Sequence, residues 1–159
     1  MSLEIRTIQS NNEIHECANL MSNSEPWVTL GRTYKESFLL LQDTSREVYI
    51  ALIEGETVGF IIIQMQGAFR GYIPTLAIKP KFRNQEIGSS LLKFAEKRIF
   101  RETPNVFICV SSFNENAKRL YIRLGYEVVG KLRNYIISGH SEILLRKSIS
   151  PLSEFQSSL

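Results

Sequence analysis

Apolar residues recur along the chain in two rhythms, and the succession of these rhythms predicts a mixed α/β fold. Spacings of three and four residues predict a helix from Ile87 and another over 114–124, and Leu91, Ala95 and Ile99 share one face of the first. Short runs rich in β-branched and aromatic residues predict strands between turn residues. These strands cover residues 3–8, 48–53, 57–66, 71–78, 106–110, 126–137 and 141–147.

Two further helices are predicted before the hairpin of residues 47–66. Asn11 or Asn12 can cap the first helix, because a short polar side chain can bind the N–H groups of a first turn. The segment Glu25-Pro26-Trp27 opens the second helix. Its buried stripe is expected to contain Leu30, Tyr34, Phe38 and Leu41. In the later helix from Ile87, the side chains expected to face solvent are Lys93, Glu96, Lys97 and Arg101.

Length, charge and cysteine content narrow the class of protein. The 159 residues suit one domain, 1–149, with a tail at 150–159 that is expected to fray. A net charge of +3, spread along the chain, suits an anionic small ligand and argues against a nucleic-acid partner. Cys17 and Cys109 lie in separate apolar patterns, so we expect buried, reduced thiols and a cytoplasmic location. No apolar run approaches the roughly 18 residues of a membrane span, and the N-terminus does not read as a signal peptide.

Residues 76–92 carry the most informative pattern. An apolar strand leads into a basic turn with Lys79, Lys81 and Arg83, and a helix begins near Gly88. The first turn of a helix leaves backbone N–H groups without helical partners at the positive end of the helix dipole. This stretch therefore predicts a seat for a polyphosphate.

Several standard sites are excluded by their missing motifs. The chain has neither a Gly-x-x-x-x-Gly-Lys-Ser/Thr loop nor a Gly-x-Gly-x-x-Gly turn, and no Gly-x-Ser-x-Gly elbow. His15 and His140 have no cysteine or carboxylate cluster at ligand spacing, so no metal is expected.

Two motifs resemble the GNAT superfamily of N-acetyltransferases. Arg83-Asn84-Gln85-Glu86-Ile87-Gly88 is similar to the family pattern Arg/Gln-x-x-Gly-x-Gly/Ala, except at Glu86. Downstream, 114–121 and 124–126 match Asn-x-x-Ala-x-x-Leu-Tyr and Gly-Phe/Tyr. The order of elements agrees from residue 3 to about 147. The resemblance implies a single α/β (α+β) domain with a mixed, mostly antiparallel sheet of about seven strands and about four helices, in which strands four and five splay apart.

By this resemblance the chain transfers an acetyl group from acetyl-CoA to a primary amine of a small molecule, peptide or protein. The transfer would be direct, in a ternary complex. Pyrophosphate would bind the backbone amides of 85–89, and pantetheine would pair with 76–78 like an added strand. The implied cofactor-binding residues are Leu76, Ala77, Ile78, Arg83, Asn84, Gln85, Glu86, Ile87, Gly88, Ser89, Asn114 and Ala117. Tyr121 matches the family's general acid and would protonate the departing thiolate, although a packing role alone would also explain an aromatic residue on its helix face.

Two departures from the pattern bear on this interpretation. Glu86 stands where the family has glycine, and its charge would repel pyrophosphate and weaken binding. The glutamate that many relatives carry early in the fourth strand is also missing. A general base must therefore come from water relayed through Tyr72, from Glu25 or from His140.

The acceptor is the least defined part of the prediction. Trp27, Tyr34 and Tyr72 are candidates for aromatic walls around an amine with an apolar body or a peptide N-terminus, and they could equally belong to the core. A homodimer stays open. The alternative function is a catalytically silent module on the same fold that binds acyl-CoA or a partner.

Overall fold

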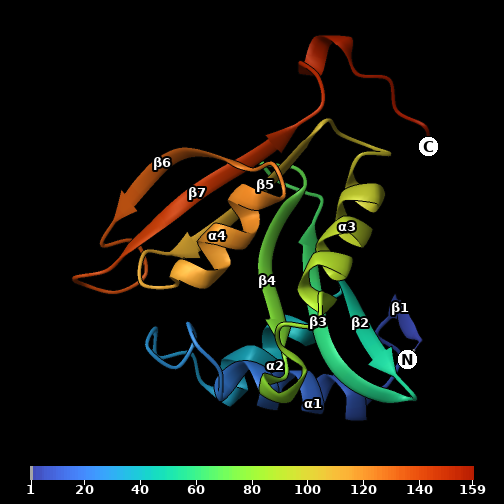
Figure 1. Cartoon of the computed structure of the whole chain (residues 1–159), viewed down its shortest axis with the longest axis vertical. Helices are drawn as coiled ribbons and strands as arrows, with labels where there is room; N and C mark the ends of the chain where they lie inside the picture. The colour runs from blue at the N-terminus through green and yellow to red at the C-terminus, as the bar shows by residue number, and fades with distance from the viewer. Residues whose placement is uncertain (1) are drawn as a thin grey trace. The chain divides into compact units, whose positions relative to one another are not determined.

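The computed structural model describes residues 2–159, which form two compact units joined by shared elements. The first unit contains the residues up to Ile63 and Thr75–Ala95, and the second contains Gln64–Pro74 and Glu96–Leu159. The hydrogen-bonded strand order is β1-β2-β3-β4-β5-β7-β6 (Figure 1). Strands β1–β2, β2–β3, β5–β7 and β6–β7 pair antiparallel, and β4–β5 pairs parallel. The predicted fold class is confirmed.

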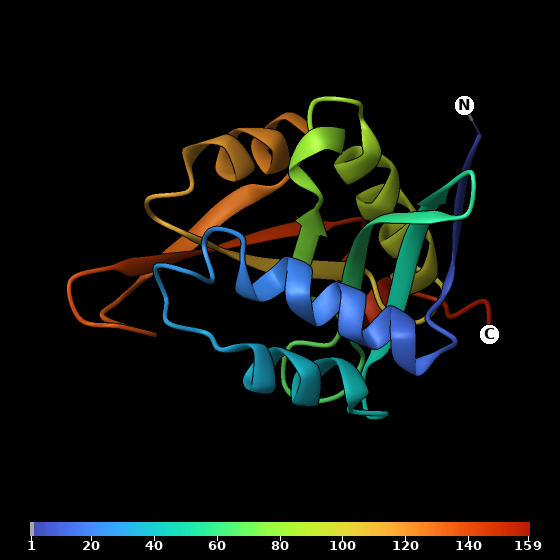
Figure 2. The same ribbon diagram turned by 90° about the horizontal axis from the view of Figure 1, so that it is seen from below.

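The first unit packs helices on strands around one apolar core. Its elements are β1 (Leu3–Thr7), α1 (Asn11–Ser22), α2 (Tyr34–Gln42), β2 (Glu47–Ile53), β3 (Glu56–Gln64), the end of β4 (Tyr72–Ile78) and most of α3 (Ile87–Ile99). Figure 2 shows α1 and α2 side by side on one face of β2 and β3. Cys17 and Met21 of α1 meet Ile50 of β2 and Phe60 of β3 there. On the other face Tyr49 packs edge-on against Phe94 of α3, with ring centroids 4.9 Å apart.

The first two helices begin at other residues than predicted. Ser10, not Asn11 or Asn12, caps α1: its hydroxyl accepts from the Glu13 N–H at 3.2 Å, and Glu13 binds back to the Ser10 N–H. The segment 24–31 forms turns, and α2 begins at Tyr34, capped by the Thr33 hydroxyl. The predicted stripe is therefore wrong in part. Leu41 is buried, whereas Tyr34 is exposed and Leu30 lies outside the helix.

The hairpin of β2 and β3 and the long helix α3 are as predicted. Glu54 and Gly55 connect the two strands with φ of 51° and 80°, as a two-residue turn with positive φ at both positions requires. In α3, Leu91, Ala95 and Ile99 are fully buried.

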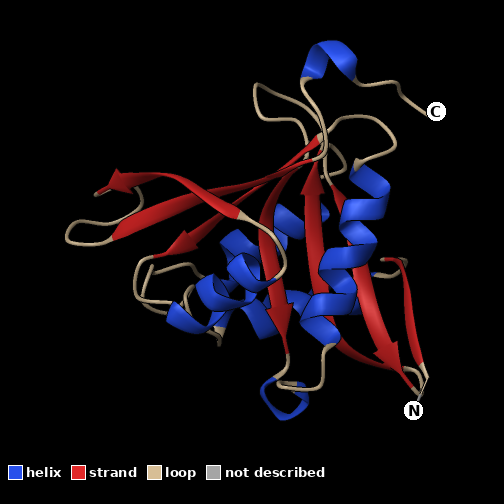
Figure 3. Ribbon diagram, turned by 45° about the horizontal axis from the view of Figure 1, so that its top comes forward, coloured by secondary structure: helices blue, strands red, loops and turns tan. Residues whose placement is uncertain are grey.

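The second unit is a sheet of β5 (Asn105–Ser111), β7 (Ser141–Ser148) and β6 (Glu127–Arg133), with the first residues of β4 and with α4 (Glu115–Arg123). The pairing of β4 with β5 is short, Tyr72 with Phe107 and Ile73 with Ile108, in agreement with the expected splay. Figure 3 shows β6 and β7 as a long hairpin.

The predicted fraying of the C-terminal tail is wrong. Leu152–Glu154 forms a short 3₁₀ helix, and the Ser158 N–H and the Ser157 hydroxyl both donate to the Arg101 carbonyl at 3.0 Å. These bonds hold the tail against the end of α3. The domain boundary at residue 149 stays a prediction.

The two faces of β5 and β7 have different characters. Ile108, Ile143 and Leu145 are buried on one face. The opposite face carries Cys109, Ser111 and Glu142, since side chains alternate along a strand.

Glu96 of α3 was expected in solvent, and the structure shows that prediction to be wrong. It is 8% exposed, and its carboxylate accepts from the Tyr126 hydroxyl at 2.8 Å and from Lys147 Nζ at 3.0 Å. The partners lie far along the chain, so the local pattern could not reveal them. Among residues 2–159, no helix is long and apolar enough to cross a bilayer.

Candidate functional site

The last residues of β4 present backbone groups along an edge that points away from β3. The Lys79 N–H donates to the Val58 carbonyl of β3 at 2.8 Å. Because a trans peptide points its N–H and C=O in opposite directions, the Ile78 carbonyl faces the other edge, where Arg83 Nε donates to it at 3.3 Å. The N–H of Ile78, and by alternation that of Leu76, points the same way. An extended ligand can hydrogen-bond to this edge.

The turn that follows β4 has an unusual backbone. After a 3₁₀ turn at Pro80–Phe82, Asn84 and Glu86 both have positive φ, 62° and 66°. Such left-handed residues turn successive N–H groups toward a concave side that suits anions. At Glu86 this conformation also explains the glycine of the family pattern, because glycine adopts it without a steric cost.

Helix α3 starts directly after this turn. The Ser90 N–H donates to the Glu86 carbonyl at 3.0 Å, so the N–H groups of Ile87, Gly88 and Ser89 belong to the first turn, which has no carbonyl to bind within the helix. The turn and the helix N-terminus thus form one continuous series of amides over 84–89.

The basic residues beside the turn are mostly engaged. Lys79 and Lys81 lie 3.7 and 3.2 Å from the Glu56 carboxylate, and Lys81 also lies over the Phe82 ring. Arg83 Nε donates to the Ile78 carbonyl. The backbone N–H groups of the turn are therefore more available to an anion than the lysine side chains are.

In the second unit, α4 carries the remaining predicted site residues. The Asn114 side chain caps the helix by accepting from the Ala117 N–H at 3.4 Å. Tyr121 is 6% exposed, with its ring centroid 6.1 Å from that of Tyr126. Burial raises the pKa of Tyr121, so its hydroxyl is protonated at neutral pH. Gly125 has a φ of 97° and follows the end of the helix, which agrees with the helix predicted over 114–124.

The three predicted acceptor residues have different environments. Trp27 is buried in the core of the first unit, so packing alone explains an aromatic residue at this position. Tyr34 is exposed on α2, where its hydroxyl meets His15 Nδ1. In the second unit, the half-buried Tyr72 hydrogen-bonds to Cys109.

Two of the predicted sources of a base, Glu25 and Tyr72, lie in surroundings that disfavour a role as general base. Glu25 accepts from the Thr29 N–H and hydroxyl at 2.9 and 2.6 Å, and these bonds lower the pKa of its carboxyl. Burial, with Cys109 next in importance, raises the pKa of Tyr72, so its hydroxyl stays protonated. His140 stands edge-on to the Phe113 ring at 5.0 Å.

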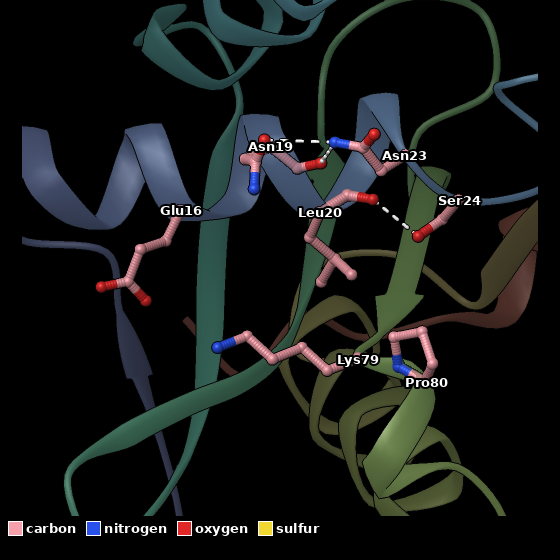
Figure 4. A pocket seen from close by; sticks show the side chains of 7 residues that line it. All are labelled: Glu16, Asn19, Leu20, Asn23, Ser24, Lys79 and Pro80. Atoms are coloured by element: carbon pink, nitrogen blue, oxygen red, sulfur yellow. Dashed lines mark hydrogen bonds between the residues drawn. The ribbon is translucent and has the colours of Figure 1, made fainter.

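A surface pocket of about 310 Å³ lies in the first unit between the end of α1 and the turn after β4 (Figure 4). Five of its seven lining residues have polar side chains, and none of the predicted acceptor residues lines it. The lining consists of Glu16, Asn19, Leu20, Asn23, Ser24, Lys79 and Pro80. At the end of α1, Asn23 Nδ2 donates to the Asn19 carbonyl at 2.8 Å. The sequence did not predict this pocket, because amide side chains on a helix surface form no recognisable motif. Among residues 2–159 no group of three or more His, Cys, Asp or Glu side chains could hold a metal ion.

Comparison with known proteins identifies the family. The model of the acetyltransferase (GNAT) family matches residues 10–126. The chain is 36% identical over 101 residues to an uncharacterized N-acetyltransferase of Methanocaldococcus jannaschii, which covers 62% of this chain and 64% of that protein. It is 27% identical over 147 residues to N-alpha-acetyltransferase 30 of Dictyostelium discoideum, covering 90% and 78%.

A solved structure shows the same fold. The ribosomal-protein-S18-alanine N-acetyltransferase from Escherichia coli has a TM-score of 0.76 and 18% identity, with 98% of this chain and 99% of that one covered. The chain belongs to the acetyltransferase (GNAT) family.

Proposed function

We propose that the chain is an acetyl-CoA-dependent N-acetyltransferase that passes the acetyl group directly to a primary amine in a ternary complex. The observation that carries this proposal is the backbone of 76–89. A strand edge with outward N–H groups runs into a left-handed turn and a helix N-terminus. The acetyl-pantetheine arm and the pyrophosphate of acetyl-CoA require these two surfaces in this order.

The residues of this stretch take separate parts in the proposed reaction. The amides of Ile87, Gly88 and Ser89 hold the pyrophosphate, and the edge of Leu76 and Ile78 aligns the pantetheine. A backbone N–H of the strand edge near Ile78 can polarise the thioester carbonyl as an oxyanion donor.

Tyr121 is the proposed general acid. A tyrosine has an unperturbed pKa of about 10 and a thiol about 8.5, and burial raises the tyrosine value further, so the hydroxyl carries a proton that it can give to the sulfur as the C–S bond breaks.

The acceptor that we propose is the α-amine of a peptide or protein N-terminus. It is supported by the N-alpha-acetyltransferase among the relatives and by the aromatic side chains of Tyr34 and Tyr72. An α-amine has a pKa of about 7.7–8.0, lower than the value of about 10.4 for a lysine, so it is more readily deprotonated. Location in the cytoplasm is proposed with it, since Cys17 and Cys109 are both free thiols.

Calorimetry with acetyl-CoA, followed by thiol release with a panel of amines, tests the function. The panel contains peptides with free and with blocked N-termini, a lysine side-chain peptide and small amines. We expect micromolar binding of acetyl-CoA, and turnover with the free N-terminal peptides above that with the blocked ones. Binding without turnover of any amine would instead support the catalytically silent module. The absence of binding at millimolar acetyl-CoA would refute the acetyltransferase and a silent acyl-CoA-binding module, and would leave the silent module that binds a partner.

A further inference from the structure

A buried carboxylate in the second unit is unexplained by packing or by ion pairing. Glu142 of β7 is 5% exposed. It lies opposite Ser111 in the β5–β7 register, and the Ser111 hydroxyl donates to Glu142 Oε2 at 2.7 Å. No Lys, Arg or His among residues 2–159 lies within ion-pair distance of this carboxylate. A glutamate without a cationic partner is rarely buried, because the charged form loses its hydration.

The groups that the sheet register and the ring contacts place around Glu142 are uncharged. On β5, Cys109 precedes Ser111 on the same face, and on β4, Tyr72 hydrogen-bonds to Cys109. The Tyr135 phenol, in the loop between β6 and β7, lies near enough to Tyr72 to influence it. On β6, Leu132 is the residue in register with Glu142. Burial raises the pKa of Glu142, and the bond from Ser111 opposes this in part. The carboxyl is thus closer to the pKa that suits proton transfer at neutral pH than an exposed glutamate would be.

Glu142 and Tyr121 lie on opposite sides of the β5–β7 sheet. Lys147 shares its face of β7 with Ile143 and Leu145, and its Nζ lies 5.9 Å from the centroid of the Tyr126 ring, against which Tyr121 packs. Glu142 is an odd number of residues away on the same strand, so its side chain points to the other face. An acid for the leaving sulfur and a base for the incoming amine are needed at separate positions, since one group cannot be protonated and deprotonated at once.

We propose that Glu142 is the general base that deprotonates the acceptor amine, directly or through one water, with Ser111 as its positioning residue. The inference rests on the acetyltransferase function proposed above. The carboxylate takes one proton from the ammonium, giving a neutral amine and a carboxylic acid. The amine nitrogen attacks the thioester carbon, the C–S bond breaks, and the sulfur takes a proton from Tyr121. Tyr121 is reprotonated from the nitrogen, and Glu142 releases its proton to solvent, so the products are the amide, the thiol and one proton.

The first test compares Glu142→Gln, which keeps the shape and an acceptor for Ser111, with the wild-type chain. We expect kcat/KM at pH 7 to fall on the order of 100-fold, with acetyl-CoA affinity unchanged within about twofold. The amine is the one of the panel that is turned over fastest. The matched control is Glu127→Gln on β6, whose carboxylate is exposed and pairs with Arg146 at 3.2 Å; it should change neither quantity.

Stability separates this role from a structural one. The native pKa of Glu142 is raised, so the stability that it contributes is present below the unfolded pKa and is lost as pH rises through the native pKa. Glu142→Gln should therefore unfold no more easily than the wild-type chain at pH 7. A merely structural carboxylate would give a destabilised variant instead.

A pH profile tests the positioning role of Ser111. Ser111→Ala removes a hydrogen bond that favours the charged carboxylate, so the acidic limb of kcat/KM should move to higher pH, with activity retained above it. A titration of the Glu142 carboxyl by ¹³C NMR needs no acceptor and should give a pKa above the ordinary glutamate range.

The outcomes distinguish this inference from the function on which it rests. If the wild-type chain binds acetyl-CoA and turns over an amine, but Glu142→Gln keeps its rate and its acidic limb, the base is elsewhere and the acetyltransferase function stands. An ordinary pKa for Glu142 in the NMR titration would overturn the inference even before an acceptor is known. Failure of the wild-type chain to bind acetyl-CoA would remove the function itself.

Discussion

The Tyr126 hydroxyl donates to the Glu96 carboxylate at 2.8 Å, and this bond ties the residue before β6 to the last turn of α3. Lys147 completes the arrangement from β7, at 3.0 Å from the other carboxylate oxygen. The carboxylate is buried, so each of its partners matters more than a partner at the surface would.

We expect Tyr126→Phe to lower the free energy of unfolding by about 2 kcal/mol, because a hydrogen bond to a buried charged group is lost. Urea denaturation at pH 7 measures this change. Tyr135→Phe is the control, since Tyr135 is 64% exposed and its loss should cost less than about 0.5 kcal/mol. Equal stability of the two variants would contradict the role of the Glu96 bond.

The left-handed backbone at Glu86 gives a second prediction. A residue with a Cβ at this φ of 66° costs roughly 1–2 kcal/mol, which glycine avoids. Glu86→Gly should therefore stabilise the fold by about 1 kcal/mol and bind acetyl-CoA more tightly, as measured by denaturation and calorimetry.

The control for this pair of effects is Glu86→Ala, which removes the charge and keeps the strain. It should improve binding without improving stability. If alanine stabilises as much as glycine does, strain is not the cause, and if neither variant changes affinity, the side chain points away from the pyrophosphate.

The close approach of β3 to β4 gives a third prediction. A Cβ on Gly59 would lie 2.7 Å from the Ala77 carbonyl oxygen and 2.7 Å from Ile78 Cδ1. Gly59→Ala should lower stability by about 1–3 kcal/mol and weaken acetyl-CoA binding, since the edge of 76–78 must shift. Gly130→Ala on β6 is the matched control, because nothing lies within 4 Å of its Cβ. Unchanged affinity in Gly59→Ala would separate this strand edge from the cofactor.

The assignment of Tyr121 gives a fourth prediction. Tyr121→Phe should lower kcat about tenfold or more with little effect on acetyl-CoA affinity, because the proton is needed only as sulfur leaves. Steady-state thiol release and calorimetry measure the two quantities. Tyr126→Phe removes the neighbouring hydroxyl and should leave kcat within about twofold. Undiminished turnover in Tyr121→Phe would leave this tyrosine with a packing role alone.

The sequence predicted best those elements whose pattern is local. The stripe of Leu91, Ala95 and Ile99, the hairpin of residues 47–66 and the end of the helix near residue 124 needed only neighbours in the chain. The predicted start of α2 was wrong because apolar residues keep a helical spacing through the turns of 24–31. Spacing reports which residues are apolar, but it does not report where hydrogen bonding to the preceding turn begins.

For the candidate site, motif residues were predictable and pairings across the sheet were not. The turn of 83–86 is contiguous, so its irregular residue, Glu86, was identified, although its φ was not. Glu142 and Ser111 are separated by 31 positions and meet only through the register of β5 with β7. A buried acid of this kind gives no signal until that register is known.

The two thiols of the chain differ in exposure, so one of them can be labelled selectively. Cys17 is fully buried, and burial raises the pKa of its thiol to about 12, so it is a poor nucleophile. Cys109 is partly exposed, on the strand face that also carries Glu142. A small alkylating reagent should therefore modify Cys109 first, and the unaltered chain carries its own reporter beside the proposed base, where an amine that occupies the site would slow the labelling.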